Sequence, residues 1–124
     1  MKKYILVIDE EQLICSGMKR ALSQERFQID TAATVTDAVC RHKASAYDVC
    51  LLDTRFDESC LALIETVRKC WPGLKIILMT TCDISPHDDM YEYLQQVGEN
   101  GVSRYLCKPF NIQQLKDAVT HVLN

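Results

Sequence analysis

The sequence predicts an α/β protein with one doubly wound sheet of five parallel strands, each followed by a helix. Short apolar runs of strand length alternate along the chain with stretches whose apolar residues recur at helical spacing, which is the pattern of βαβ units. The chain of 124 residues has the length of one domain and contains no internal repeat or linker. We therefore expect residues 1–124 to form a single domain.

The first half of the chain predicts two strand–helix units. An apolar strand over residues 4–8 is followed by a helical stretch. The apolar face expected for this helix consists of Ile14, Met18, Ala21 and Leu22. Residues 27–32 alternate in polarity and predict a second strand. The motif Thr34-x-x-Asp37 then has the form of a capping box that opens a short helix ending near residue 43.

Two more units follow in the second half. The strand over residues 48–52 precedes a helix that stops at Trp71-Pro72-Gly73, because this sequence cannot continue a helix. The apolar face expected for this helix consists of Leu61, Ile64 and Val67. A fourth strand over residues 76–79 leads to Ser85-Pro86, which is typical of a helix N-terminus. This helix should end at Gly98 and bury Met90, Leu94 and Val97.

The last unit is a short strand over residues 103–107 and a helix capped by Asn111. The inward residues expected for this helix are Ile112, Leu115, Val119 and Val122. The first, third and fourth strands are almost continuously apolar, as strands covered on both faces should be. The second and fifth strands are more polar and suit the sheet edges. Right-handed crossovers then predict the strand order 2-1-3-4-5.

Polar residues that can hold a phosphoryl group or a cation follow four of the strands. Asp9 and Glu10 follow the first strand, and Asp53 follows the third. Thr80 follows the fourth strand and Lys108 the fifth. Ligands of such sheets bind beyond the carboxyl ends of the strands, between strands one and three. Converging carboxylates repel one another unless a cation lies between them, and an all-oxygen ligand set favours Mg²⁺. The lysine and the hydroxyl complete a cradle for a tetrahedral dianion.

Composition excludes several classes of function. The net charge is −3, with 14 basic and 17 acidic residues and no basic cluster, which argues against nucleic acid or an anionic membrane as a direct partner. No apolar stretch approaches the ~18 residues of a membrane span, and the first residues do not form a signal peptide. We therefore expect a cytoplasmic protein.

The seven cysteines form no Cys-x-x-Cys pair and no zinc-type spacing with histidine. In a reducing compartment we expect them to act as small buried hydrophobic residues. A redox-sensor role for an exposed cysteine is the alternative.

Four short motifs stand at the predicted strand ends. They are Ile8-Asp9-Glu10-Glu11, Leu51-Leu52-Asp53, Met79-Thr80-Thr81 and Lys108-Pro109-Phe110. With these motifs in this order, the chain resembles the receiver domain of two-component response regulators over essentially its whole length. The resemblance implies a flavodoxin-like fold and a phosphorylation-dependent signalling switch rather than an enzyme.

The resemblance also implies a role for each residue of the site. Asp53 would accept a phosphoryl group from a histidine kinase, a phosphotransfer protein or a small phosphodonor. The implied ligands of Mg²⁺ are Asp9, Glu10, Asp53 and the backbone carbonyl of Arg55. Thr80 and Lys108 would contact the phosphoryl oxygens, and Tyr105 would move inward behind Thr80.

The expected output face consists of the helix opening at Ser85, the strand over residues 103–107 and the last helix. Its side chains would include Tyr91, Tyr93, Arg104 and Tyr105, and the same face could form a homodimer. We expect the chain to hold the receiver domain alone, without an output domain.

Two departures from the family pattern leave a second interpretation open. Glu10 stands where the family usually has an aspartate, and its extra methylene moves the carboxylate outward, which predicts weaker Mg²⁺ binding. Residues 56–61 lack the proline and glycine that commonly follow the acceptor. The alternative is therefore a degenerate receiver that acts as a constitutive docking or dimerisation module. A more remote one is a phosphatase resembling haloacid dehalogenases, with Asp9 as nucleophile and Glu11 two residues further on.

The peptide bond between Lys108 and Pro109 is predicted to be cis. The lysine must turn back over the carboxylates immediately after an edge strand, while the chain reverses into the helix capped by Asn111. A cis bond before proline makes this reversal in one step at a cost of ~0.5–1 kcal/mol, and the resembling family has it.

Overall fold

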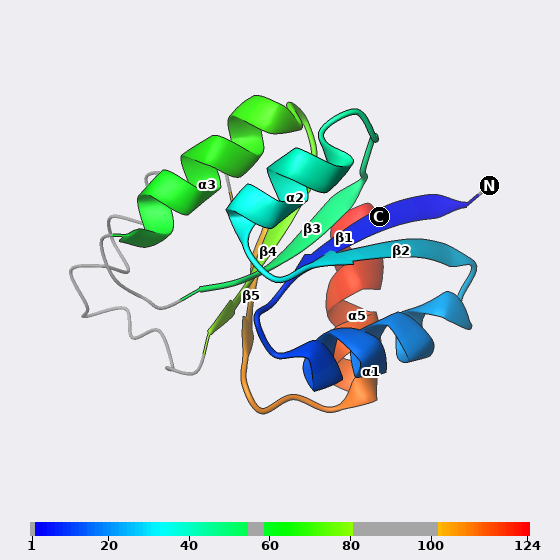
Figure 1. Cartoon of the computed structure of the whole chain (residues 1–124). Coiled ribbons are helices and arrows are strands. Elements are labelled where there is room, and N and C mark those ends of the chain that lie inside the picture. The colour runs from blue at the N-terminus through cyan, green and yellow to red at the C-terminus, as the bar shows by residue number, and fades with distance from the viewer. Residues whose placement is uncertain (1, 55–58, 81–101) are drawn as a thin grey trace.

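The computed structural model describes residues 2–54, 59–80 and 102–124 (Figure 1). Its elements are β1 (Lys3–Ile8), α1 (Gln12–Ser23), β2 (Phe27–Ala32), α2 (Val35–His42), β3 (Val49–Asp53), α3 (Ser59–Cys70), β4 (Lys75–Thr80), β5 (Arg104–Cys107) and α5 (Ile112–Leu123). The five strands form one sheet in the order β2-β1-β3-β4-β5, and all four pairings are parallel. The predicted fold class and strand order are therefore confirmed. The helix predicted to open at Ser85 lies outside the described residues.

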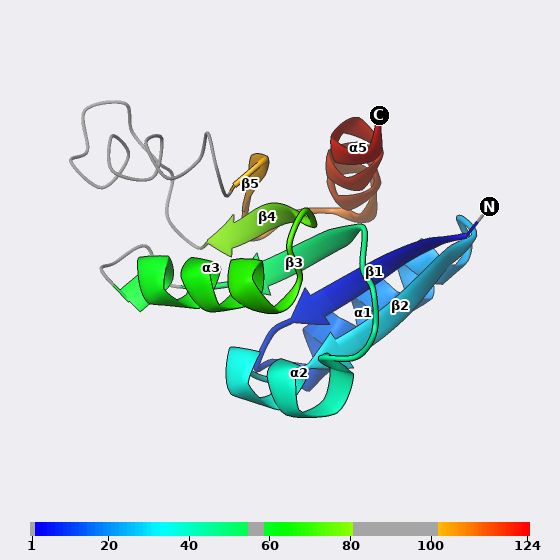
Figure 2. The ribbon, with the colours of Figure 1, turned by 90° about the horizontal axis from the view of Figure 1, so that it is seen from above.

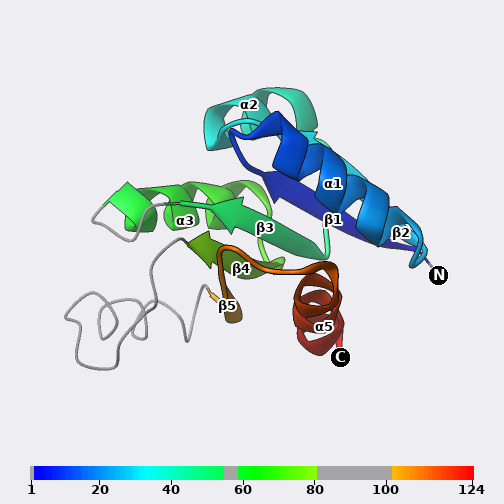
Figure 3. The ribbon, with the colours of Figure 1, turned by 90° about the horizontal axis from the view of Figure 1, so that it is seen from below.

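The helices cover both faces of the sheet (Figure 2, Figure 3). On one face, α2 and α3 pack against Leu6, Cys50 and Leu78. On the other face, α1 and α5 pack against strand neighbours such as Val7 and Leu51. Alternate residues of a strand point to opposite faces, so a continuously apolar strand serves both layers. This explains why β1, β3 and β4 lie in the centre of the sheet and the more polar β2 and β5 at its edges.

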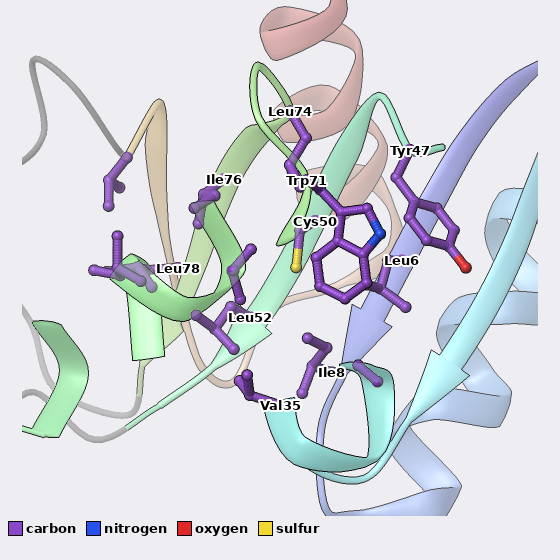
Figure 4. Close-up of a cluster of buried hydrophobic side chains, with 14 of the residues drawn as sticks. Leu6, Ile8, Val35, Tyr47, Cys50, Leu52, Trp71, Leu74, Ile76 and Leu78 are labelled. Carbon is purple, nitrogen blue, oxygen red and sulfur yellow. The ribbon is translucent and has the colours of Figure 1, made fainter. Parts of the chain in front are cut away.

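The layer under α2 and α3 is anchored by the single tryptophan of the chain, Trp71 (Figure 4). Its ring packs edge-on against Tyr47 at a centroid distance of 5.8 Å, and its Nε1–H donates to the carbonyl of His42 at 3.3 Å. The Tyr47 hydroxyl donates to Asp30 at 2.7 Å. These bonds give the polar atom of each ring a hydrogen-bond partner, so the two large rings can be buried without the free-energy cost of an unpaired donor.

The predicted helix ends are confirmed with one correction. The Asn111 side chain and Gln114 form a complete capping box at the start of α5, with both bonds at 2.8 Å. The Thr34 hydroxyl accepts from the amide of Asp37 at 3.0 Å. However, the Asp37 carboxylate accepts from Ala33 and not from Thr34, so the predicted capping box of α2 is only half formed. After α3 the chain turns at Gly73, whose φ of 86° favours glycine.

Two predicted helix faces need correction. In α1, Met18, Ala21 and Leu22 are buried as predicted, but Cys15 is buried in addition and Ile14 is only half-buried. In α5, Ile112 is 59% exposed. It is the first residue of the helix, and burial begins one turn later at Leu115, where the sheet lies beneath the helix.

The cysteines divide between the core and the surface. Cys15, Cys50 and Cys60 are buried, as predicted for small hydrophobic residues, and Cys70 is half-buried. Cys40 and Cys107 are exposed, so the prediction of burial is wrong for these two. Cys82 lies outside the described residues. Burial raises the pKa of the Cys50 thiol to about 12, because β3 is covered on both faces.

Replacing Cys50 with valine should make the free energy of unfolding fall less steeply as the pH rises above 9. The thiol ionises near its ordinary value of 9.0 in the unfolded chain, but only near about 12 in the folded protein. Between these values the unfolded chain holds fewer protons, so the free energy of unfolding falls by about 1.4 kcal/mol per pH unit because of this group. Urea unfolding of both proteins between pH 8 and 10.5 measures the difference, where ~1.4 kcal/mol per unit is the upper limit. Parallel pH profiles would contradict it.

Candidate functional site at the carboxyl edge of the sheet

The predicted site residues gather at one edge of the sheet, beyond the carboxyl ends of its strands. Asp9 follows β1, Asp53 and Thr80 end β3 and β4, and Lys108 follows β5. Backbone bonds fix the positions of these ends. The Asp9 amide donates to Ala32 at 3.0 Å, and the Lys108 amide donates to Thr80 at 2.7 Å. The sheet therefore brings together residues up to 99 positions apart in the sequence.

Lys108 bridges two carboxylates. Its Nζ lies 2.8 Å from Asp9 Oδ2 and 3.0 Å from Asp53 Oδ1. The Asp9 side chain is fully buried and that of Lys108 is 11% exposed, while the Asp53 side chain is 27% exposed. Asp53 is thus the member of the trio that an incoming molecule can reach.

Asp9 is held from both sides. Its second carboxylate oxygen, Oδ1, accepts from the amide of Glu11 at 2.9 Å, and its carbonyl accepts from the thiol of Cys15 at 3.2 Å. A buried charge is tolerated when it is paired and hydrogen-bonded, and Asp9 meets both conditions. Sequence reasoning missed these two partners, because a backbone amide and a thiol carry no recognisable signal in the sequence.

The charges of the trio shift one another. Burial raises the pKa of Asp53; the hydrogen bond from Lys108 opposes this, and the charge of Asp9 adds to the rise. Burial by itself lowers the pKa of Lys108, but its hydrogen bonds to Asp9 and Asp53 outweigh burial, so its pKa is raised. The lysine therefore carries its positive charge throughout the neutral range.

A cavity of about 620 Å³ opens beside Asp53. Glu10, Glu11, Thr34 and Lys108 contribute to its polar wall. Every side-chain donor in this set other than the lysine is an oxygen, which fits Mg²⁺ rather than zinc. Glu10 is exposed, and the described residues contain no cluster of three or more His, Cys, Asp and Glu side chains close enough to hold a metal ion. The structure therefore brings Asp9, Asp53 and Lys108 together, with Glu10 at the cavity wall.

The remaining predicted residues are placed in part. Thr80 is buried at the end of β4. Tyr105 pairs with Leu78 and Cys107 with Thr80 in the parallel register, so Tyr105 lies one step behind Thr80 on the same face of the sheet. Arg55, whose carbonyl was expected to bind the metal, lies outside the described residues, as do Thr81, Tyr91 and Tyr93. The peptide bond between Lys108 and Pro109 is cis, which confirms that prediction.

Comparison with known proteins identifies the family to which the chain belongs. Residues 5–120 match the family model of the response regulator receiver domain. The chain belongs to this family. Receiver domains of two-component systems act as phosphorylation-dependent signalling switches, and the strand-end trio occupies the part of the fold where the resemblance expected it.

The receiver domain has curated relatives among transcriptional regulators. It is 30% identical over 112 residues to the probable transcriptional regulatory protein TcrX of Mycobacterium tuberculosis, covering 90% of this chain and 45% of that protein. It is 29% identical over 117 residues to the transcriptional regulatory protein KdpE of Staphylococcus aureus, covering 94% of this chain and 48% of that protein. The chain thus spans about half the length of these relatives.

Solved structures share the fold. A response regulator from Thermotoga maritima superimposes with a TM-score of 0.82 at 21% identity, covering 99% of this chain and 98% of that one. The chemotaxis protein CheY4 of Vibrio cholerae superimposes with a TM-score of 0.81 at 23% identity, covering 99% of this chain and 100% of that one. The part of the receiver domain that the structure describes contains no helix suited to crossing a membrane.

Proposed function

We propose that this receiver domain accepts a phosphoryl group on the carboxylate of Asp53. The observation that carries the proposal is the trio at the strand ends. Asp9 is fully enclosed, whereas Asp53 is partly exposed beside the cavity and lies 3.0 Å from the ammonium group of Lys108. An accessible carboxylate with a fixed cation at its side has the arrangement needed by a phosphoryl acceptor.

The transfer step uses the donor's own phosphoryl group. A carboxylate oxygen of Asp53 forms a bond to phosphorus as the bond from phosphorus to the donor's imidazole nitrogen or acyl oxygen breaks, and the donor leaves with that electron pair. The transition state is loose and needs mainly alignment and charge neutralisation. Lys108 is already in place to contact one phosphoryl oxygen, because its ammonium group is held by Asp9. The Asp9 carboxylate is held in turn by the amide of Glu11.

Magnesium is part of the proposal. Asp9, Glu10 and Asp53 would hold the ion, together with the carbonyl of Arg55, and when bound it would neutralise charge on the phosphoryl oxygens. The carboxylates of Glu10 and Asp53, which both line the cavity, support this assignment. Glu10 is the weakest member of the set, because it is exposed and longer than the aspartate usual in the family.

The switch would read the phosphoryl group through Thr80 and Tyr105. A charge-assisted hydrogen bond contributes about 1.5–3 kcal/mol and a neutral one about 1 kcal/mol. Moving an equilibrium from 1:99 to 99:1 requires about 5.5 kcal/mol, so Thr80 would need the contributions of Lys108 and the metal. The proposed output face joins β5 and α5 to the helix predicted to open at Ser85, which lies outside the described residues.

The proposed partners are a sensor histidine kinase or a phosphotransfer protein. We place the domain in the cytoplasm, where such donors act. We propose that the 124 residues form one receiver domain.

Intact-mass spectrometry with acetyl phosphate tests the proposed function. One phosphoryl adduct should form with Mg²⁺ and none with excess chelator. A degenerate docking module would give no adduct under either condition. A phosphatase would instead turn over a generic phosphoester in an activity that survives Asp53→Ala but not Asp9→Ala. The complete enclosure of Asp9 speaks against that last role.

Shortening Glu10 to aspartate should tighten Mg²⁺ binding. The longer side chain places its carboxylate further out at the cavity wall, and the shorter one would bring it back toward Asp9 and Asp53. An isothermal titration of both proteins with MgCl₂ measures the change, and Glu11→Asp serves as a matched control at the neighbouring acid. Equal or weaker binding by Glu10→Asp would show that the loop is already adapted to glutamate.

A further inference from the structure

One buried side chain of α1 contacts the phosphoryl site from below. The thiol of Cys15 donates to the backbone carbonyl of Asp9 at 3.2 Å, across six positions of the chain. Side chains of a helix that bond backwards usually reach carbonyls three or four positions earlier. This longer bond therefore depends on the turn of the chain from β1 into α1, and it reports the shape of that turn. Both residues are buried.

Cys15 holds both neighbours of Glu10. Its thiol binds the carbonyl of Asp9, and its amide donates to the carbonyl of Glu11 at 3.1 Å. The Glu11 amide in turn donates to Asp9 Oδ1 at 2.9 Å. The backbone on either side of Glu10 is thus tied to the first turn of α1 by one residue, while the Glu10 side chain stays exposed at the cavity wall.

The start of α1 is fixed differently from the starts of α2 and α5. Those two helices are capped by the side chains of Thr34 and Asn111, and such caps normally fix the entry of the chain into a helix. The N-cap residue of α1 is Glu11, whose side chain makes no cap hydrogen bond within the part of the chain that the structure describes. The thiol bond at Asp9, two residues earlier, gives the turn a fixed point that the cap does not provide.

We propose that Cys15 is a positioning residue for the phosphoryl site, whose thiol holds the turn from Asp9 to Glu11 in the geometry that binds Mg²⁺. The inference rests on the proposed function, because Asp9 and Glu10 are the expected metal ligands. Groups that orient metal ligands affect metal affinity without touching the ion. A thiol is a weak donor, so its loss should raise the Mg²⁺ dissociation constant by about two- to fivefold rather than abolish binding.

Packing alone offers a competing explanation for a small residue at position 15. Cys15 belongs to the buried layer that also contains Val7 and Leu51, and an apolar residue of similar size would fill that space as well. The two explanations differ in what they require of the side chain. Serine keeps a hydrogen-bond donor but buries a hydroxyl, whereas valine keeps the apolar volume without a donor. The two replacements should therefore separate a positioning role from a packing role.

Isothermal titration with MgCl₂ tests the proposal, at a temperature where thermal melts show every variant to be folded. Cys15→Ala and Cys15→Val should each bind Mg²⁺ about two- to fivefold more weakly than the wild type. Cys15→Ser should bind within about twofold of the wild type, because it keeps a donor. Urea unfolding without metal should give the opposite order, with Cys15→Ser less stable than Cys15→Val, because the hydroxyl is the more costly group to bury.

The rate of phosphoryl uptake from acetyl phosphate provides a second readout. Below the wild-type dissociation constant for Mg²⁺, Cys15→Ala and Cys15→Val should take up the phosphoryl group more slowly than the wild type. At saturating Mg²⁺ the rates should converge, because Asp53 and Lys108 are unchanged. A positioning residue acts on metal affinity, so a defect that persists at saturating Mg²⁺ would contradict the proposal.

The same three substitutions at Cys50 serve as the matched control. Cys50 is buried in the opposite layer, under α2 and α3, so its variants should change stability but leave the Mg²⁺ dissociation constant within about twofold of the wild type. An equal loss of affinity in the Cys50 variants would show that any buried cysteine has this effect, and would overturn the proposal.

The order of Mg²⁺ affinities among the Cys15 variants decides the inference. Affinity that follows stability, with Cys15→Val tight and Cys15→Ser weak, would assign Cys15 to packing alone. Equal affinities in all variants, or an equal loss in all three, would also overturn the proposal. A wild-type protein that neither binds Mg²⁺ nor forms the phosphoryl adduct would remove the proposed function as well. Normal binding and uptake with no effect of Cys15 would remove this inference only.

Discussion

Asp53→Asn should abolish uptake of the phosphoryl group from acetyl phosphate. The amide is nearly the same size as the carboxylate, so the fold is kept, but its oxygen is no longer an anionic nucleophile. We expect the adduct seen by intact-mass spectrometry with Mg²⁺ to disappear completely. The effect should exceed that of any other single substitution, because the acceptor atom itself is lost.

Asp117→Asn is the matched control for this experiment. Asp117 is an exposed aspartate of α5 that accepts from Gln113 at 2.8 Å, and it does not line the cavity beside Asp53. The control should take up the phosphoryl group as the wild type does. A residual adduct in Asp53→Asn, mapped by peptide sequencing to another residue, would show that the acceptor has been assigned wrongly.

Lys108→Met should destabilise the fold and impair the switch together. The methionine keeps most of the side-chain volume but leaves Asp9 and Asp53 facing each other without their shared cation. Removing one partner of a buried ion pair typically costs about 3–5 kcal/mol; because Asp53 is partly exposed, we expect about 2–3 kcal/mol here. Urea unfolding without metal measures this loss. Added Mg²⁺ should restore part of it, since the ion also neutralises carboxylates.

Lys116→Met separates this effect from the loss of any lysine. Lys116 pairs with Glu25 at 2.9 Å on the surface, where such pairs contribute about 0–1 kcal/mol. The control should therefore change the free energy of unfolding by less than half as much. If the two variants were equally stable, Lys108 would not be the counter-ion that holds the strand ends together.

The sequence alone was sufficient for the strands and their order. Apolar runs such as residues 49–52 must be covered on both faces, and the mixed polarity of residues 27–32 fits an edge strand. Both are local properties, because the side chains of a strand point alternately to the two faces of the sheet, so the polarity of each residue indicates whether its face is covered. The cap at Asn111 was predictable for the same reason, since its partner is only three residues away.

The predicted site depended on topology as well as residue type. Asp9, Asp53 and Lys108 could be assigned to one edge because parallel strands all end at the same side. The contacts among these three side chains and the exposure of each could not be predicted. Which carboxylate is enclosed and which faces the cavity depends on contacts between distant segments, such as the bond from Lys108 to Asp9 across 99 residues, and these contacts are decided by packing.

The sequence prediction was wrong about the burial of individual helix residues, because burial depends on which other segments pack against the helix. Ile112 has the spacing of a core residue, but it is the first residue of α5 and is 59% exposed, and burial begins only at Leu115. Cys15 is buried beneath α1, where its thiol also reaches the carbonyl of Asp9, while Ile14 packs only at the margin of the same cluster. The local pattern determined which elements form and which ends carry the chemistry. Only the tertiary structure decided which side chains are covered, because burial is a property of the neighbouring segments and not of the residue itself.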